Sequence, residues 1–272
     1  MYRFLLTPRW FGWLALALAA AMVMTLLGFW QLHRYEERSE INQRIDAADV
    51  ADPAPLTRLL SAPGPDQQVG PAAPGETGWA MVEATGRFNE AHEVLVRGRT
   101  VEGRVGFEVV TPLVLPDGTA VLVNRGWVPP SEDGAAARPE VPPAPAGDVT
   151  VVARVRFSES GPRPVEEHAG ALQTRRINLD ALAPHVPYPL YGAYLQMEAP
   201  TQDGLTPIPV RRENAWLNGG YAVQWWIFAG MALAGYVWFV RREARGALRQ
   251  PPASAPPAAD NRAESVERGG GT

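Results

Sequence analysis

The sequence predicts a membrane protein of the α+β class, in which two transmembrane helices flank one extracytoplasmic, mainly antiparallel β domain with a few short helices. Three observations predict this arrangement. Long apolar segments occupy residues 10–32 and 220–240. Strand-like segments fill much of the region between them, and arginines stand on the terminal side of both apolar segments. At a rise of 1.5 Å per residue, a helix of about 20 apolar residues crosses the hydrocarbon layer of a bilayer.

The first apolar segment carries no charged residue between Arg9 and Arg34. A cleaved signal peptide is the alternative interpretation, because Arg3 and Arg9 would form its basic start. The apolar part of a signal peptide usually has about 7–15 residues, which is shorter than this segment. The segment also ends in Phe29 and Trp30, and aromatic residues are typical of a membrane–water boundary. These features favour an uncleaved anchor.

The distribution of arginines predicts the topology. Positively charged residues accumulate on the cytoplasmic side of membrane helices. Arg3 and Arg9 precede the first segment, and Arg241, Arg242 and Arg245 follow the second. Both termini should therefore be cytoplasmic, in a multi-pass membrane protein. The expected parts are a cytoplasmic N-terminus (1–9), a first transmembrane helix (10–32), a β-rich external domain (33–219), a second transmembrane helix (220–240) and a cytoplasmic, disordered tail (241–272).

The middle of the chain has the pattern of a β domain. Segments rich in Val, Leu and Phe predict strands at residues 80–88, 93–99, 107–115, 119–128, 149–157 and 191–198. The sequence Leu115-Pro-Asp-Gly118 predicts a hairpin turn. An amphipathic helix is expected over 34–50, and a short capped helical turn over 178–182. Proline-rich segments predict loops at 51–78 and 129–147.

Composition excludes several classes of function. A net charge of -4 argues against general nucleic-acid binding, and the absence of cysteine excludes disulfides and thiolate metal sites. No common hydrolase or phosphate-binding motif occurs, and the four histidines are not spaced as metal ligands. We therefore expect neither an enzyme nor a metal site. An external hydrolase or transferase would need a catalytic constellation that the sequence does not contain.

Polar and aromatic residues at the outer ends of both apolar segments form a first set of candidate contacts. This set consists of Trp30, Gln31, Arg34, Tyr221, Gln224 and Trp225. One interpretation is interfacial anchoring together with a hydrogen bond between the helices. The other is a groove at the outer leaflet that contacts a membrane partner or a flat apolar ligand.

The segment Val121–Pro129 carries a second set of candidates. This set consists of Asn124, Arg125 and Trp127, with Arg97 and Arg99 on a preceding strand. In one interpretation the segment is a strand that ends in a turn, with Gly126 required for backbone geometry. In the other, the arginines present paired donors to a carboxylate, such as a porphyrin propionate or an acidic loop of a partner.

Several of these segments resemble the Surfeit locus protein 1 family, the cytochrome c oxidase assembly factors. The matching pieces are Leu27–Gln31 with Arg34, Pro53–Leu56, Gly86–Phe88, Val110–Pro112, Val121–Pro129, and Tyr221 with Gln224–Trp226. Their order and spacing extend over residues 10–240. Two terminal spans around one external domain complete the resemblance.

The resemblance implies a non-enzymatic role in maturing the haem-bearing catalytic subunit of cytochrome c oxidase, at haem a insertion. That subunit and the lipid bilayer are the expected partners, and nucleic acid is not. Some bacterial members look like haem a binders with a histidine at the outer start of the second helix, where this chain has Asn218. We therefore expect no firmly bound cofactor, and at most a transient contact with haem a. The alternative is a membrane-anchored binding module unrelated to the oxidase.

Overall fold

The computed structural model describes residues 6–134, 137–161 and 164–247. Disorder is expected over residues 241–272, but residues 241–247 are helical, as the end of the helix Ala215–Ala247. Residues 248–272 of the expected tail lie outside the described residues, and so do residues 1–5 of the expected N-terminal segment. The chain forms two compact units that divide between Arg34 and Tyr35 and between Ala215 and Trp216. The unit Tyr35–Ala215 lies within residues 33–219, where the external domain is expected, and its side of the membrane stays a prediction.

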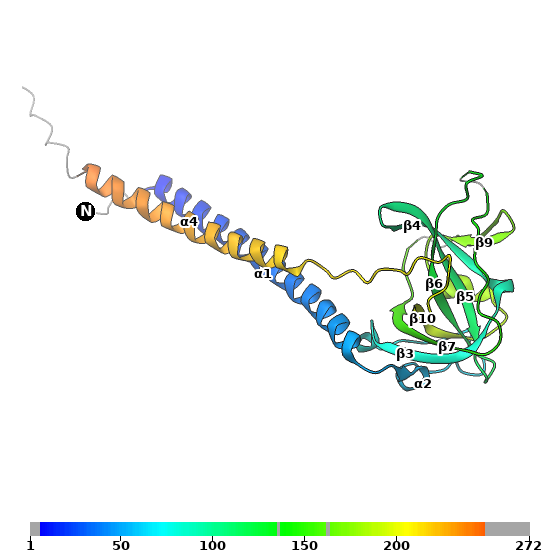
Figure 1. Ribbon diagram of the computed structural model, residues 1–272. Helices are drawn as coiled ribbons and strands as arrows, with labels where there is room; N and C mark the ends of the chain where they lie inside the picture. The colour runs from blue at the N-terminus through cyan, green and yellow to red at the C-terminus, as the bar shows by residue number, and fades with distance from the viewer. Residues whose placement is uncertain (1–5, 135–136, 162–163, 248–272) are drawn as a thin grey trace, which may run out of the picture. The chain divides into compact units, whose positions relative to one another are not determined.

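The first unit is a pair of long helices, α1 (Pro8–Val50) and α4 (Ala215–Ala247), of which residues up to Arg34 and from Trp216 belong here (Figure 1). The helices run antiparallel, because Trp10 packs on Tyr236 and Phe29 packs on Trp226, with ring centroids 6.2 and 5.7 Å apart. Helix α4 begins five residues before the predicted position 220.

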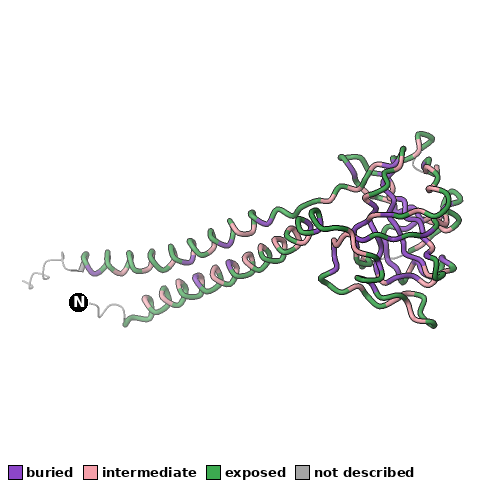
Figure 2. The backbone as a smooth tube through the Cα atoms, turned by 60° about the horizontal axis from the view of Figure 1, so that its bottom comes forward, coloured by how far each residue is buried: buried purple, intermediate pink, exposed green. Residues whose placement is uncertain are grey.

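Both helices are long and apolar enough to cross a membrane. In the most apolar 18-residue stretch of each helix, only 11% of α1 and 6% of α4 is buried, whereas the core helix of a soluble protein would be mostly buried. Figure 2 shows the same contrast between mostly exposed helices and a buried β core. So much exposed apolar surface is unusual for a soluble monomer and suggests a membrane protein.

The second unit is mainly β. Its principal strands are β3 (Met81–Phe88), β4 (Val94–Val101), β5 (Arg104–Val114), β6 (Ala120–Val128), β7 (Val149–Phe157) and β10 (Leu190–Ala199). The shorter elements are β1 (Ala54–Pro55), α2 (Leu56–Leu59), β2 (Val69–Ala72), β8 (Glu166–His168), β9 (Ala171–Thr174) and α3 (Leu179–Leu182). All six strands predicted from the sequence are present, and their ends differ from the predicted ones by at most three residues. Gly118, with φ +82°, forms the predicted turn between β5 and β6.

Five strands close into a ring in the order β3, β7, β10, β6, β5 and back to β3. Neighbours cannot all be antiparallel around a ring with an odd number of strands, so at least one pair must be parallel. That pair is β6 with β10, where Tyr194 lies beside Leu122. In the described residues, β1–β3, β2–β10 and β4–β9 are parallel as well. The sheet is therefore more mixed than the predicted antiparallel one, although its hairpins are antiparallel.

Strand β6 is the centre of the unit, because every residue from Ala120 to Val128 is buried. Val121 and Val123 belong to a cluster that includes β3, β7 and β10 residues. Ala120 and Leu122 belong to a second cluster, which includes the buried Leu179 and Leu182 of α3. A strand that is covered on both faces reads as a continuous apolar run, as this one does over its first four residues.

The predicted loop at 51–78 contains β1, α2 and β2, so the loop prediction is wrong there. Both strands add to the sheet in parallel, by pairing with β3 and β10. Long-range pairing of this kind leaves no periodic pattern in a segment rich in Pro and Gly. Phe157, at the end of β7, is 43% exposed although its side chain is large and apolar.

The last turns of α1 are fastened to the β unit by ion pairs. Arg154 of β7, whose side chain is only 8% exposed, lies 2.6 Å from both Asp49 and Glu198. Arg212 pairs with Asp49 at 2.7 Å, and Ile45 is fully buried. The Arg154 contact is the largest cause of the lowered pKa of Asp49. The predicted helix over 34–50 is thus confirmed, and it is continuous with the first apolar helix.

Gly86 is required where β3 meets β5, because a Cβ atom there would clash with the carbonyl oxygen of Val114. We predict that Gly86→Ala destabilises the β unit by about 1–3 kcal/mol, the usual cost of overpacking. Thermal unfolding of the full-length protein in detergent measures this. Gly75→Ala is the matched control, because a Cβ atom at Gly75 meets nothing within 4 Å. Equal unfolding midpoints for both variants would show that the β unit tolerates a Cβ atom where β3 meets β5.

Candidate functional site

Arg125 is the extra residue of a β-bulge in strand β6. Val109 lies opposite Gly126 and Val110 opposite Asn124, so Arg125 has no partner residue across β5. Gly126 adopts φ +150°, and a Cβ atom there would lie 3.0 Å from Leu205. A bulge re-aims a side chain locally. The prediction that Gly126 serves backbone geometry is therefore supported, but the predicted turn is wrong, because the strand continues through the bulge to Val128.

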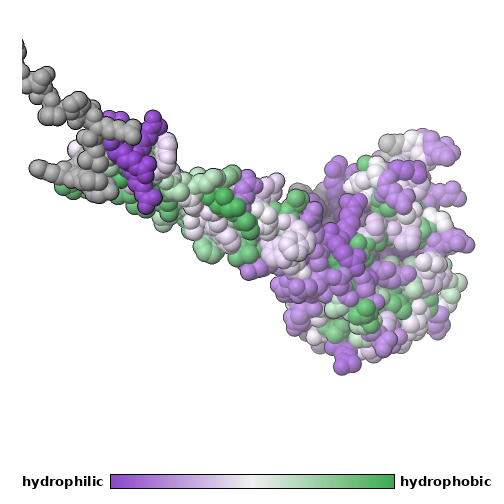
Figure 3. Space-filling view, turned by 60° about the vertical axis from the view of Figure 1, so that its left-hand side comes forward, coloured by the Kyte–Doolittle hydropathy of each residue, from purple (hydrophilic) through white to green (hydrophobic). Residues whose placement is uncertain are grey.

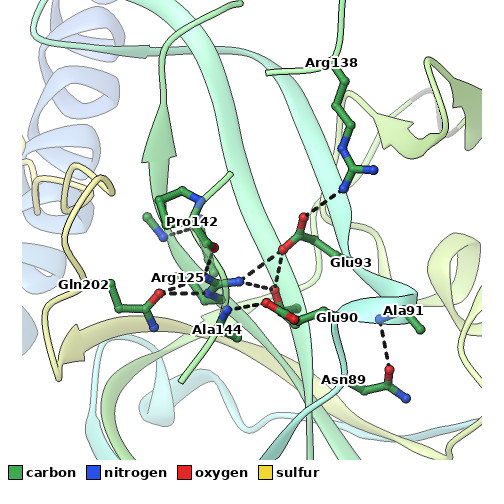
Figure 4. A network of polar contacts seen from close by, with 12 residues as sticks. Asn89, Glu90, Ala91, Glu93, Arg125, Arg138, Pro142, Ala144 and Gln202 are labelled. Carbon is green, nitrogen blue, oxygen red and sulfur yellow. Dashed lines mark hydrogen bonds and ion pairs between the residues drawn. The ribbon is translucent and has the colours of Figure 1, made fainter. Parts of the chain in front are cut away.

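All five N–H groups of the Arg125 guanidinium are used inside the protein (Figure 4). Nη1 donates to Glu93 Oε2 at 3.1 Å and to Thr111 Oγ1 at 3.4 Å. Nη2 donates to the Pro142 carbonyl at 2.7 Å and to Gln202 Oε1 at 2.8 Å, and Nε donates to the same Gln202 oxygen at 3.2 Å. An arginine has five donors, so none is left for a carboxylate from outside.

Burial dominates the electrostatics of this network. The Arg125 side chain is 0% exposed and that of Glu93 is 7% exposed. Burial raises the pKa of Glu93, against the opposing effect of Arg125 and Arg138, and burial also lowers the pKa of Arg125. Figure 4 shows Arg138 reaching the second Glu93 oxygen, at 3.7 Å. Each of the two buried charges therefore compensates the other, and removing one would leave the other buried without its main partner.

A second polar cluster contains Arg99, Asn124 and Trp127. Arg99 Nη2 lies 2.8 and 2.7 Å from the two carboxylate oxygens of Glu159. Asn124 donates to Glu108 at 2.9 Å, and Glu108 lies 3.3 Å from Arg99 Nε. Trp127 Nε1 donates to the Arg99 carbonyl at 3.0 Å. Burial raises the pKa of Glu108, with Arg99 as the largest opposing influence.

The structure thus brings together three of the five residues that the sequence singled out in this unit. Arg125 belongs to a separate network, and Arg97 pairs with Glu166 at 3.3 Å. The carboxylates of the clusters come from the same chain. The sequence analysis missed these acidic partners, Glu93, Glu108 and Glu159. A glutamate inside an apolar strand, as Glu108 is within β5, was the signal that could have found them.

In the helix unit, the residues predicted to lie at the outer ends of the helices have different degrees of exposure. Trp30 is 58% exposed and Tyr221 is 49% exposed, Gln224 is exposed, and Gln31 and Trp225 are partly buried. Arg34 is exposed at the end of this unit. Among the described residues, no hydrogen bond joins Gln31 to Gln224, although the sequence suggested one between the helices. Contact of these residues with a partner stays a prediction.

The helices pack closely at Gly28, which the sequence analysis noted only within a motif. A Cβ atom at this position would clash with the indole of Trp226. Phe29 contacts the same indole edge-on. In lipid, small residues allow close helix packing, which replaces the hydrophobic driving force of water.

Comparison with known proteins decides the family. The family model described as the SURF1 family matches residues 18–230. SURF1-like proteins of Mycobacterium tuberculosis and Mycobacterium bovis are 35% identical to this chain over 266 residues. The alignments cover 93% of this chain and 92% of each relative. The chain belongs to the SURF1 family. Both Gly28 and the network around Arg125 lie within the segment that matches the SURF1 family.

More distant SURF1 family relatives carry descriptive names. Surfeit locus protein 1 of Xenopus tropicalis is 28% identical over 164 residues, covering 54% of this chain and 48% of its own length. A cytochrome oxidase assembly protein of Saccharomyces cerevisiae, SHY1, is 26% identical over 116 residues, covering 42% of this chain and 28% of its own length.

The Arg125 network yields a stability prediction. Arg125→Met should destabilise the protein by about 3–5 kcal/mol, because it leaves Glu93 buried without its main partner. Thermal unfolding of the full-length protein in detergent measures this. Arg87→Met is the matched control. Its partner is Asp148 at 2.5 Å and both side chains are exposed, so its loss should change the unfolding midpoint little. If Arg125→Met unfolds like the control, the guanidinium is not needed to hold the bulge.

The close contact at Gly28 yields a prediction for the helix unit. Gly28→Val should push Trp226 away and weaken the helix pair, which heat-induced aggregation in detergent would report as a lower midpoint. Gly12→Val on the same helix is the matched control, because a Cβ atom there meets nothing within 4 Å. An unchanged midpoint for Gly28→Val would show that the two helices do not depend on this contact.

Proposed function

We propose that this protein is a membrane-anchored assembly factor for cytochrome c oxidase that assists maturation of the haem-bearing catalytic subunit, at haem a insertion. Membership of the SURF1 family carries the proposal, since one yeast relative is named a cytochrome oxidase assembly protein. The two apolar helices hold the protein in a bacterial cell membrane, with both termini in the cytoplasm. The arginines beside the helices support this orientation.

The internal pairing of the polar clusters supports a binding role rather than catalysis. Arg125 and Arg99 are bound to carboxylates of the same chain, so they shape the β unit instead of presenting charge. Residues 124–127 are buried, so in this proposal they hold the neighbouring surface of the β unit in place and do not themselves contact the partner. In this proposal, the exposed surface of the β unit contacts the oxidase. In the helix unit, the contact residues are those at the outer ends of the two helices.

The outer ends of the helices offer a surface suited to a membrane-embedded partner. Gln224 is exposed beside the half-exposed ring of Tyr221. A polar amide on an apolar helix is costly in lipid unless a neighbour bonds to it. A polar group on a transmembrane helix of an oxidase subunit would satisfy it.

Haem a is cargo in this proposal. At the outer start of α4 the chain has Asn218, whose Nδ2 is buried and has no hydrogen-bond partner among the described residues. A carboxamide is a far weaker ligand of haem iron than an imidazole. Asn218 therefore does not fit axial ligation. We assign it no haem-binding step, and propose that the protein acts on the oxidase subunit without holding haem firmly.

Deletion of the gene tests the proposal. Membranes of the deletion strain should lose most of the haem a absorption and cytochrome c oxidase activity, while cytochromes of other classes persist. Expression of the wild-type chain from a plasmid should restore both. Unchanged oxidase spectra and activity in the deletion strain would reject the assembly role and leave a binding module unrelated to the oxidase.

Complementation with Gln224→Leu tests the docking surface separately. No side-chain hydrogen bond within the described chain depends on Gln224, so the variant should accumulate normally and restore oxidase poorly. Ile227→Leu is the matched control, because Ile227 is also on α4 and 55% exposed. Full restoration by Gln224→Leu would limit this residue to anchoring.

A further inference from the structure

A groove lies between α1 and α4 at the end of the helix pair opposite to the predicted oxidase-contact residues. Its volume is about 700 Å³. The side chains that line it include Arg9, Trp10, Trp13, Tyr236, Phe239 and Arg242. All of them belong to the helix unit. The groove therefore combines aromatic walls with a guanidinium from each helix.

Positive charge is concentrated at this end. Arg9 directly precedes one apolar span and Arg242 follows the other, and no carboxylate pairs with either within the described chain. Arg242 lies over the ring of Trp238, 5.3 Å from its centroid. Arg241 and Arg245 line a neighbouring hollow. Figure 3 shows the hydrophilic side chains gathered beside the apolar helix surface.

The only acidic side chain that lines the groove is Glu243, among the described residues. The arginines at this end outnumber it, so the groove attracts an anion. Guanidinium groups bind phosphate with two parallel hydrogen bonds, and basic sites between membrane helices suit anionic lipid headgroups.

The floor of the groove is apolar and open. Ala17, Ala232 and Gly235 contribute small or absent side chains. A Cβ atom at Gly235 would meet nothing within 4 Å, so unfilled space lies directly above this residue. A free phosphate would use the arginines but not this apolar floor, whereas a phospholipid would use both.

We propose that this groove binds one anionic phospholipid. Its phosphate lies between Arg9 and Arg242, and an acyl chain lies along the floor past Gly235. The aromatic rings cover the boundary between headgroup and chain, the position that Trp and Tyr favour in membranes. The proposal requires only that the helix pair lies in a bilayer, so it does not depend on the role in oxidase assembly.

The charge requirement can be tested with the full-length protein in nanodiscs of phosphatidylglycerol and phosphatidylcholine, followed by native mass spectrometry. The wild type should retain one phosphatidylglycerol in preference to phosphatidylcholine. Arg9→Gln/Arg242→Gln should reduce that retention by about tenfold or more, since bonds to charged groups are the strong ones. Arg241→Gln/Arg245→Gln removes the same charge from the same end but not from the groove, and should keep the lipid.

The shape requirement has its own matched pair. Gly235→Leu places a side chain in the groove and should reduce retention, whereas Gly230→Leu on the same helix also meets open space but does not line the groove. Equal loss in both arginine variants, equal retention in both leucine variants, or no preference for phosphatidylglycerol would overturn the proposal. So would a protein dimer that occupies the groove without lipid. Because nanodiscs present both leaflets and contain no oxidase, neither topology nor assembly activity affects the result.

Discussion

The β unit depends on one constraint, the closure of an odd number of strands into a ring. A ring of five strands needs a parallel pair, and here it joins β6 to β10. This pairing places β6 between two apolar clusters and buries all its residues. Because no side of β6 reaches solvent, Asn124 and Arg125 must find their hydrogen-bond partners within the protein. The polar clusters are consequences of where this strand lies.

The buried arginines and the exposed ones differ in what they contribute. Arg125 has 0% side-chain exposure and five internal bonds, whereas Arg87 is 70% exposed and pairs with a single carboxylate. Exposed pairs are screened by water and contribute little, but breaking a buried pair leaves an uncompensated charge. In a chain without cysteine, no disulfide can compensate for such a loss. The core and these buried networks therefore hold the β unit together.

The helix unit follows different physics. The exposed apolar surface of these helices suggests that they lie in lipid. Water does not drive helices together within lipid, so there close packing and aromatic contacts would do so. The contact of Trp226 with Gly28 and Phe29 supplies both near one end, and that of Trp10 with Tyr236 acts near the other. The polar residues lie at the ends of the spans. One end then carries the amide and aromatic residues proposed for the oxidase, and the other carries the arginines proposed for lipid.

The sequence alone determined the two apolar helices, the six principal strands, the turn at Gly118 and the family, because each leaves a local pattern of hydropathy, turn residues or motif. It also singled out Arg125. Only the tertiary structure decided the parallel pairings, the short strands within 51–78 and the partners of each charge. These depend on residues far apart in the chain, such as Arg125 with Gln202 or Asp49 with Arg154. A local pattern shows that a side chain is charged, but only the fold determines whether that charge faces a partner protein or a carboxylate of its own chain.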